Sequence, residues 1–421
     1  MRAFAFYRSF DARERRMFWL LLGSSVFDGL TQGVILLQET IAKKALGASD
    51  FQVTMIGVIA TATMIFSVLV GLFFSGRSKT GLLAASLVAG RLVFLAAFLV
   101  ETPNWYMALL FAYHAAWSIQ SPVFNSFFQR HLARHRGRVF GLSRTVTLAF
   151  SMAAALACGR LLDADPSLYK PVLAAVAATG SVMYLLYIAM DRMTAYRADQ
   201  AGRVRHALRS YRQMLGRSDF MLFEAMFMVY GLAFMVMVPA VPLFLINKLQ
   251  FSYFQMAQAS GFYSQIFIIL LMPLAGALYD RADPWKVAAA SIAVLLGYPL
   301  LFAVSHQTML RGFAYGGLAF FSLGLTGIQV LWNLGSLHFD RGSDAFIYQG
   351  FHVTLTGLRG VAGPLAGYWL LSRFGFMSNF AVAFGLFALA GGISLLGCRR
   401  YGGCRGAAGS REDGHAVPAV R

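Results

Sequence analysis

Charged residues are scarce in this chain of 421 residues. Asp, Glu, Lys and Arg make up only 13% of the sequence, whereas hydrophobic residues make up 58%. About a quarter of the residues of a typical soluble domain are charged, because its surface must be solvated. The composition therefore excludes an ordinary soluble protein and indicates an integral membrane protein.

Acidic residues are half as numerous as basic ones, 18 against 36, so the formal net charge is +18. A nucleic-acid-binding protein would concentrate this surplus on one soluble face. Here the Lys and Arg residues lie mainly in the polar segments that share a side with the N-terminus, above all in residues 192–217. By the positive-inside rule we expect both termini in the cytoplasm, and we expect no nucleic-acid partner.

Cysteine is almost absent, and the three residues Cys158, Cys398 and Cys404 provide no disulfide framework. The spacing of the eight His and three Cys residues matches no zinc site. A stretch beginning at Gly71 imitates a phosphate-binding loop, but Arg77 stands where that loop needs Lys. We therefore predict no enzymatic activity, no metal and no cofactor.

What the chain does contain is a series of twelve apolar stretches. The hydrocarbon core of a bilayer is roughly 30 Å thick, and a helix needs about 20 residues to cross it. The sequence thus predicts an all-α membrane protein with twelve transmembrane helices. We expect them at residues 17–37, 53–74, 81–100, 105–128, 139–162, 171–190, 220–246, 256–279, 287–304, 312–337, 346–371 and 380–397.

The longest internal polar segment divides these helices six and six. A short sequence echo supports a duplication: Phe51-Gln52 precedes the second helix, and Phe254-Gln255 precedes the eighth. We expect a disordered C-terminal tail, because it is rich in Gly, Ala and Arg and has no hydrophobic periodicity. The predicted organisation is a cytoplasmic segment 1–16, a six-helix bundle 17–190, a cytoplasmic linker 191–219, a six-helix bundle 220–397 and a cytoplasmic tail 398–421.

A motif follows the second helix of each half. In the second half, Gly276 is followed four residues later by Asp280-Arg281, and in the first half Gly71 and Arg77 are present without the acid. With the six-plus-six pattern, the chain resembles the major facilitator superfamily of secondary transporters over residues 17–397. The resemblance implies two pseudo-symmetric six-helix bundles, transport by alternating access and a gating role for the five motif residues.

Asp28 lies near the middle of the first predicted helix, with Gln32 one turn further on. An ionised side chain at the bilayer centre costs at least about 2.5 kcal/mol on insertion scales, so it needs a partner or water. In the resembled fold the first helix lines the central cavity, which places Asp28 and Gln32 on the substrate or proton pathway. The alternative is a structural role, in which the helix is broken here, helped by Gly29 and Gly33, and Asp28 caps it or holds it together through the neighbouring backbone.

Two polar stripes follow the helical period, one in the fourth predicted helix and one in the tenth. From them we predict that an aqueous pathway is lined by His114, Ser118, Asn125, Gln329 and Asn333. The alternative is that these side chains only form hydrogen bonds between helices.

Arg359 lies near the middle of the eleventh predicted helix, in a glycine-rich stretch that also contains Pro364. A guanidinium stays charged at any working pH, so Arg359 needs a carboxylate, a group of carbonyls or an anionic ligand. An ion pair with an internal carboxylate such as Asp28 is the alternative to ligand binding.

Arg144 and Glu224 lie near the predicted cytoplasmic ends of the fifth and seventh helices. Both are candidates for a cytoplasmic gate, although long side chains near helix ends also reach the membrane interface. Pro239 and Pro242 are expected to break the seventh helix.

These observations favour a monomeric, proton-coupled secondary transporter of a small organic solute. It would lie in the lipid bilayer of a bacterial cytoplasmic membrane. Its small-molecule substrate is either an organic anion or an amphipathic compound. The alternative is a transport-inactive relative that serves as a sensor or an assembly subunit, since the first-half motif lacks its acid.

Overall fold

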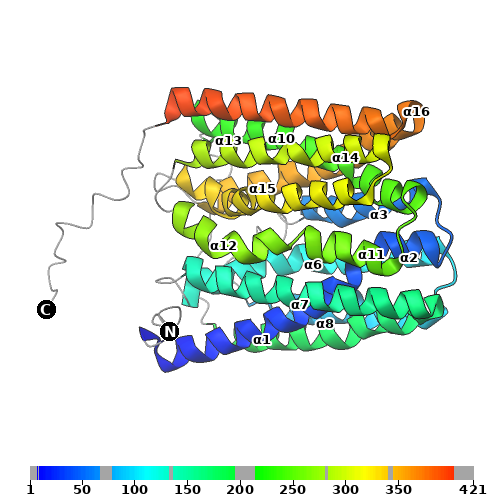
Figure 1. Ribbon diagram of the computed structural model, residues 1–421. Helices are drawn as coiled ribbons and strands as arrows, with labels where there is room; N and C mark the ends of the chain where they lie inside the picture. Colours follow the sequence, from blue (N-terminus) through cyan, green and yellow to red (C-terminus); the bar gives the residue numbers. More distant parts are fainter. Residues whose placement is uncertain are drawn as a thin grey trace, which may run out of the picture.

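The computed structural model describes residues 7, 9–66, 78–131, 136–194, 214–279, 283–339 and 345–402. Within these ranges the chain is helical and contains no strand. The helices run side by side along one axis, and α1 begins at the same end of the bundle at which α16 ends (Figure 1). The chain therefore crosses the bundle an even number of times.

The N-terminal half contains six main helical segments. Several of them change from α-helix to 3-10 helix along their length, so they comprise more than one element. Its elements are α1 (Ala12–Ile35), α2 (Gln38–Lys44), α3 (Asp50–Ala62), the 3-10 segment η2 (Thr63–Phe66), α5 (Thr80–Gly90), the 3-10 segment η3 (Leu92–Leu99), α6 (Pro103–His131), α7 (Arg136–Ala164), the 3-10 turn η5 (Pro166–Leu168) and α8 (Tyr169–Arg192).

The C-terminal half follows the same plan. Its elements are α10 (Ser218–Leu243), the π-helical segment η6 (Phe244–Lys248), α11 (Tyr253–Ala257), the π-helical segment η7 (Gln258–Tyr263), α12 (Ile266–Tyr279), α13 (Pro284–Leu295), α14 (Gly297–Thr308), α15 (Arg311–His338) and α16 (Ala345–Tyr401). Gly375, with a φ of 79°, interrupts α16 and divides it into two helical segments. A left-handed φ of this kind favours glycine.

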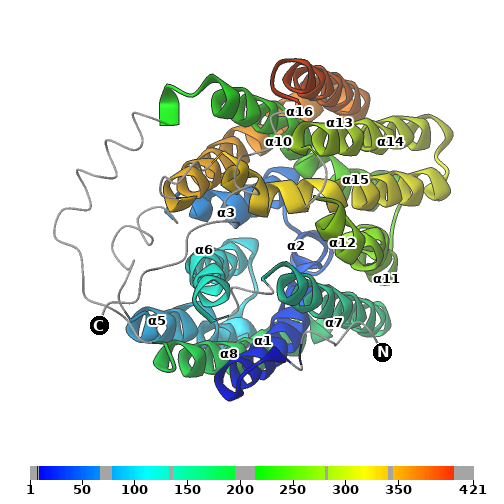
Figure 2. The ribbon, with the colours of Figure 1, turned by 90° about the vertical axis from the view of Figure 1, so that its left-hand side faces the viewer.

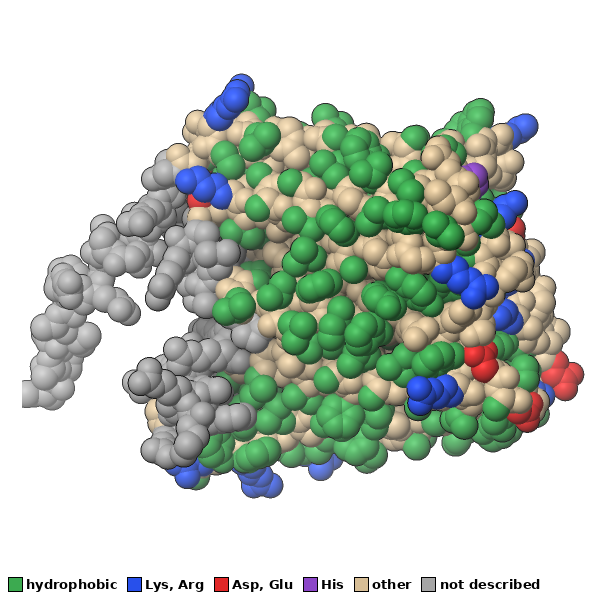
Figure 3. Space-filling model, in the orientation of Figure 1, with side chains coloured by type: hydrophobic (Ala, Val, Ile, Leu, Met, Phe, Trp, Pro, Cys, Tyr) green, Lys and Arg blue, Asp and Glu red, His purple; other side chains and the backbone are tan. Residues whose placement is uncertain are grey.

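Eight helical segments of the described chain are long and apolar enough to cross a membrane, and Asp50–Ile65 is a shorter apolar helix. One of the eight, Phe351–Tyr401, contains the break at Gly375 and so consists of two helical segments. The arrangement is consistent with the twelve predicted crossings. Hydrophobic side chains cover the middle of the surface, and most charged ones gather towards its two ends (Figure 3). This is the pattern expected of a protein embedded in a bilayer.

The two halves meet mainly along α3 and α7 of the N-terminal half. Within the N-terminal half α1 packs against α7 and α8, and within the C-terminal half α10 packs against α16. Across the boundary α3 packs against α16, and α7 packs against α11 and α12. Figure 2 shows α3 and α12 between the other helices of the two halves.

The predicted sequence echo corresponds to one local structure repeated in both halves. Ser49 caps α3 and Ser252 caps α11, and each forms a reciprocal capping box with a glutamine three residues later, Gln52 or Gln255. Two backbone N–H groups at each helix start are thereby satisfied.

Some local expectations differ from the structure. Pro239 and Pro242 do not break the seventh helix, since α10 is continuous through both and passes into the π-helical segment η6. Neighbouring helices support a transmembrane helix around proline, and local π-helical adjustment can re-satisfy freed backbone groups. The first helix begins at Ala12 because Asp11 and Glu14 form a capping box there. The predicted tail beyond residue 402 and linker residues 195–213 lie outside the described residues.

Candidate functional site

Asp28 of α1 lies in a group of neutral hydrogen-bond donors inside the N-terminal half. Its side chain is 8% exposed. Gln32 Nε2 donates to Asp28 Oδ2 at 2.8 Å, and Gln120 Nε2 of α6 lies 3.4 Å from Asp28 Oδ1. Gln120 Nε2 also donates to the hydroxyl of Tyr187 on α8 at 3.2 Å. Side chains of α1 and α6 therefore bind the carboxyl group directly, and α8 is joined to it through Gln120.

Two arginines contribute positive charge to the surroundings of this carboxyl group. Arg144 of α7 and Arg91, which lies between α5 and η3, both interact electrostatically with Asp28. Arg144 was predicted as a cytoplasmic gate residue, and the structure places its charge in the surroundings of Asp28. The arrangement combines a buried acid, neutral amides and a nearby guanidinium, which is suited to holding either a proton or a polar ligand.

Arg91 is fully buried without a hydrogen-bonded carboxylate partner among the described residues. Its guanidinium donates to the carbonyls of Gly90 and Tyr113 at 2.9 and 3.3 Å, and it lies over the rings of Tyr113 and Tyr184 at 4.2 and 5.1 Å. Cation–π contacts and carbonyl dipoles thus stabilise its charge inside the bundle.

The predicted stripe of α6 does not converge on Asp28. His114 Nε2 lies 3.1 Å from Gln38 Oε1 of α2, and Ser118 donates to the carbonyl of Ala115 in its own helix at 2.8 Å. Asn125 lies in α6, but its side chain is outside the described part of the structure. The α6 residue that reaches Asp28 is Gln120, which the stripe pattern did not include.

The C-terminal half contains a second buried acid, paired with a histidine. His352 Nδ1 of α16 lies 3.0 Å from both carboxylate oxygens of Glu224 on α10, and each side chain is 2% exposed. The rings of Phe227 and Trp332 pack against the imidazole at centroid distances of 4.8 and 5.9 Å. His352 Nε2 has no hydrogen-bond partner within the described ranges, so a proton on Nδ1 best satisfies this pair.

Arg359 lies two turns along α16 from His352. It donates to the carbonyl of Phe227 and, at 3.1 Å, to Thr356 Oγ1, while Thr356 donates to the carbonyl of His352 at 3.0 Å. The acid that interacts electrostatically with Arg359 is Glu224 of its own half. Asp28 and Arg359 share no hydrogen bond or ion pair among the described residues, and each belongs to the cluster of its own half.

The predicted stripe of the tenth helix is bonded within its own helix. Asn333 Nδ2 of α15 donates to the carbonyl of Gln329 at 2.8 Å, and both side chains are partly buried. Neither residue has a hydrogen bond to the Glu224–His352 pair in the described structure. Their role in a pathway stays a prediction.

Most of the predicted gating motif cannot be placed. Gly71, Arg77, Asp280 and Arg281 lie outside the described residues, and Gly276 lies in α12, where the surroundings of its side chain are not described.

An acid that the motif pattern did not predict lies next to this region. Asp191, at the end of α8, accepts hydrogen bonds from Ser78 Oγ at 2.9 Å, Lys79 N at 2.9 Å and Thr80 Oγ1 at 2.8 Å. It thereby fixes the start of α5. In space, Asp191 therefore places a carboxylate beside residues 78–80, which follow the first-half motif that lacks an acid.

Among the residues that the structure describes, no group of three or more His, Cys, Asp or Glu side chains could hold a metal ion. The functional candidates in the described structure are the two buried acid clusters, one around Asp28 and one around Glu224. Sequence reasoning did not connect His352 with Glu224. It omitted Gln120, Tyr187 and Thr356, which are polar side chains within apolar helices. That is the one signal by which they could have been found.

Comparison with known proteins agrees with this architecture. The family model of the Major Facilitator Superfamily matches residues 21–342. No curated protein matches the chain.

Solved structures show the same fold at low sequence identity. A variant of the nucleoside transporter NupG aligns with a TM-score of 0.69 and 14% identity over 90% of this chain and 99% of that one. A D-xylose-proton symporter aligns with a TM-score of 0.66 and 13% identity over 90% of this chain and 96% of the other. The family match covers most of the chain, and the chain therefore belongs to the major facilitator superfamily.

Proposed function

We propose that the protein is a proton-coupled secondary transporter that moves a small organic solute by alternating access. The observation that carries this proposal is the hydrogen-bonded position of Asp28 between Gln32 and Gln120, with the charge of Arg144 nearby. A carboxyl group buried in a membrane helix is expensive to keep, so it marks a transport or proton site by default.

The surroundings of Asp28 suit both of its protonation states. When the group is ionised, the two amide N–H donors and the positive charge of Arg144 stabilise it. When it is protonated, its hydroxyl needs an acceptor. Gln120 Oε1 is buried without a partner among the described residues, and rotation of that amide would turn the oxygen towards Asp28. Gln120 therefore allows proton uptake without leaving Asp28 unpaired.

The Glu224–His352 pair supports the same reading from the other half. Each half of the protein carries a buried acid on its first helix, Asp28 on α1 and Glu224 on α10. Two halves that rock about a site near the mid-membrane would both contribute side chains to it. We assign proton binding to Asp28, and we propose that Glu224, His352 and Arg359 form the facing wall of the site.

The chemical class of the solute depends on whether charged or apolar side chains contribute most to its binding. An organic anion would use the positive charges of Arg359 and Arg144, whereas an amphipathic solute would use methionines such as Met226 and Met235 on α10. A thermal-unfolding screen of the purified protein with organic acids, sugars and amphipathic drugs separates the two, because a bound ligand stabilises the folded state. Stabilisation by acids alone would favour the anion.

The decisive experiment uses proteoliposomes and a solute found in that screen. An imposed pH gradient should drive its flux with the wild-type protein, and Asp28→Asn should abolish that response while leaving binding measurable. Asp165→Asn is the matched control, because Asp165 is exposed and caps the short turn η5. Wild-type, pH-driven flux in Asp28→Asn would overturn the assignment of the proton site.

If no solute is moved under any gradient, while stable complexes with another membrane protein form, the transport-inactive alternative holds instead. We further propose a monomer in a bacterial cytoplasmic membrane with both termini in the cytoplasm. Reporter fusions at each end of the chain test that orientation.

A further inference from the structure

Three charged side chains of the N-terminal half reach one short segment of the C-terminal half. The side chains are Lys44, Asp50 and Asp163, and the segment is residues 247–254, which run from the end of η6 into the first residues of α11. We call these contacts the clasp. They lie at the end of the bundle where α2 and α11 meet, opposite the end at which α1 begins (Figure 1). That end is the predicted extracytoplasmic one.

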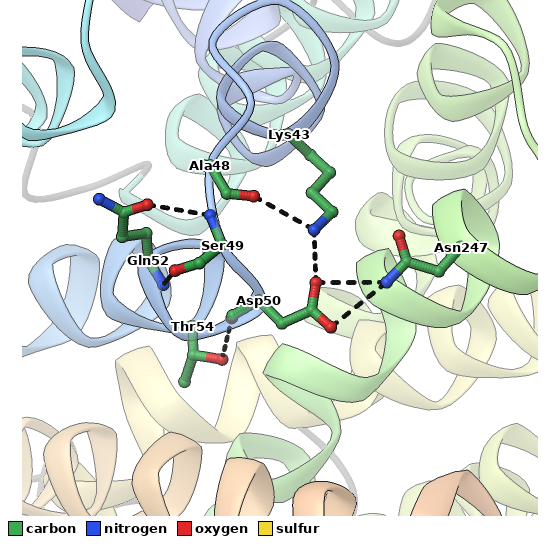
Figure 4. Close-up of polar contacts among 7 residues, drawn as sticks. All are labelled: Lys43, Ala48, Ser49, Asp50, Gln52, Thr54 and Asn247. Atoms are coloured by element: carbon green, nitrogen blue, oxygen red, sulfur yellow. Dashed lines mark hydrogen bonds and ion pairs between the residues drawn. The ribbon is translucent and has the colours of Figure 1, made fainter.

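The first contact of the clasp is made by Asp50 at the start of α3. Lys43 Nζ binds Asp50 Oδ1 at 2.5 Å and also donates to the carbonyl of Ala48 at 3.1 Å. Asn247 Nδ2 lies 3.3 Å from Asp50 Oδ1 and 3.5 Å from Oδ2. Figure 4 shows the carboxylate between Lys43 of its own half and Asn247 of the other. Lys43 therefore orients the group that Asn247 binds.

The second contact is made by Lys44, the last residue of α2. Its Nζ donates to the carbonyl of Phe251 at 2.7 Å and lies 5.0 Å from the centroid of the Tyr253 ring. A charged donor to a backbone carbonyl forms a stronger hydrogen bond than a neutral one. Lys44 thus holds the backbone of the segment itself.

The third contact is made by Asp163 near the end of α7. Its two carboxylate oxygens accept the backbone N–H groups of Tyr253 at 2.7 Å and Phe254 at 3.0 Å. N–H groups in the first turn of a helix have no acceptor within that helix. Ser252 satisfies the N–H of Gln255, so the N-terminal half supplies the acceptor for the two that precede it.

Small residues lie directly beneath the clasp and bring the helices close together. A Cβ on Gly159 of α7 would lie 2.8 Å from Ala257 Cβ and 2.9 Å from Phe254 Cα. The clasp itself is reached by water, since Asp163 is exposed and the Asp50 side chain is 44% exposed. Exposed ionic contacts are individually weak, so several together can close a surface and still be broken reversibly.

We propose that Lys44, Asp50 and Asp163 are positioning residues of the transport cycle that hold the extracytoplasmic end closed through residues 247–254. Opening of this end requires the halves to separate, which breaks all three contacts together. The inference rests on the proposed function only in assuming that the two halves move relative to each other.

The test measures how often this end opens, without requiring a transported solute. Cys158, Cys398 and Cys404 are replaced by alanine, and Val238→Cys is introduced as the reporter. Val238 of α10 packs against Gly57 of α3, between the halves. A membrane-impermeant maleimide is then added to the extracytoplasmic face of oriented membrane vesicles, and the initial rate of labelling is recorded.

Asp163→Ala should raise the labelling rate by about three- to tenfold, because loss of a helix-capping side chain shifts an opening equilibrium by about that factor. The labelling rate should rise by similar amounts in Asp50→Ala and in Asn247→Ala, because each substitution removes one partner of the same contact. Asp165→Ala is the matched control and should leave it unchanged, since Asp165 caps a turn within its own half. Asp163→Asn, which keeps one acceptor, should fall between Asp163→Ala and the parent.

Equal labelling rates in the parent, Asp163→Ala and Asp50→Ala would overturn the clasp. Thermal unfolding of each variant shows whether it is folded. If Asp163→Ala does not fold, the pair Asp50→Ala and Asn247→Ala decides the outcome. If the clasp variants raise the labelling rate but the protein moves no solute, the proposed function is wrong and the clasp still holds. If the variants leave the labelling rate unchanged and the protein shows proton-driven flux, the clasp is wrong and the proposed function still holds.

Discussion

The guanidinium of Arg359 occupies the space that a side chain on Gly231 would fill. A Cβ built on Gly231 of α10 would overlap Nε and Cζ of Arg359 on α16. In the other half, Cγ, Cδ and Nε of Arg91 occupy the corresponding space beside Gly180 of α8. In each half a buried arginine therefore crosses a neighbouring helix at a glycine, and the absence of a side chain there is what lets the arginine lie flat against that helix.

Gly231→Ala should destabilise the protein by about 1–3 kcal/mol, the usual range for overpacking a filled interior. The added methyl group displaces Arg359, which then loses its hydrogen bonds to Phe227 and Thr356. Thermal unfolding in detergent measures the effect. Gly385→Ala is the control in the same half, because a Cβ there would meet nothing within 4 Å. Equal unfolding temperatures for the two variants would contradict the prediction.

His352→Leu should destabilise the C-terminal half by about 1–3 kcal/mol, because it leaves the buried carboxyl group of Glu224 without its partner. Glu224→Gln should have a smaller effect, since the amide oxygen still accepts the Nδ1 proton of His352. Chemical unfolding of both variants in the same detergent compares them. A loss from Glu224→Gln as large as that from His352→Leu would show that the full negative charge, and not the hydrogen bond, holds this pair.

Asp191→Ala should destabilise the N-terminal half by about 1–3 kcal/mol, because the start of α5 loses the acceptor of three hydrogen bonds. Asp191→Asn keeps one acceptor oxygen at the same place and should recover much of the stability. Hydrogen exchange of the backbone amides at residues 79–83 measures the local effect. Unchanged protection in Asp191→Ala would show that α5 begins independently of Asp191.

Gly159→Ala should weaken closure of the predicted extracytoplasmic end without altering any charge. The methyl group would press on Ala257 and on the backbone of Tyr253 and Phe254, and so push α11 away from α7. The expected result is faster labelling of the Val238→Cys reporter. Gly141→Ala on the same helix is the control, because a Cβ at Gly141 meets nothing within 4 Å among the described residues. Slower or equal labelling in Gly159→Ala would contradict close packing as part of the closed state.

Much of the architecture could be predicted from the chain alone, because a bilayer imposes a length and a polarity on every helix that crosses it. The echo of Phe51-Gln52 in Phe254-Gln255 marked two helix starts that the structure shows as equivalent capping boxes. The continuity of α10 through Pro239 and Pro242 was not predicted, since proline propensity reflects an isolated helix and not one supported by its neighbours.

The candidate site was less accessible to sequence reasoning. Hydropathy singled out Asp28 and Arg359, because a charged residue in the middle of an apolar helix is conspicuous without any knowledge of the fold. Glu224 was predicted only as a gate candidate near the end of the seventh helix. Their partners were not evident: Gln120 reaches Asp28 from α6, and His352 reaches Glu224 across more than a hundred residues of chain.

The amino-acid sequence was enough to predict a bundle of membrane-crossing helices in two related halves, since hydrophobic length and repeated motifs are properties of single segments. The packing of the helices was needed to show which buried acid faces which amide, imidazole or guanidinium, and which charged residues of one half bind the other. Those pairings depend on how helices distant in the chain lie side by side, and periodicity within one helix carries no information about its neighbour.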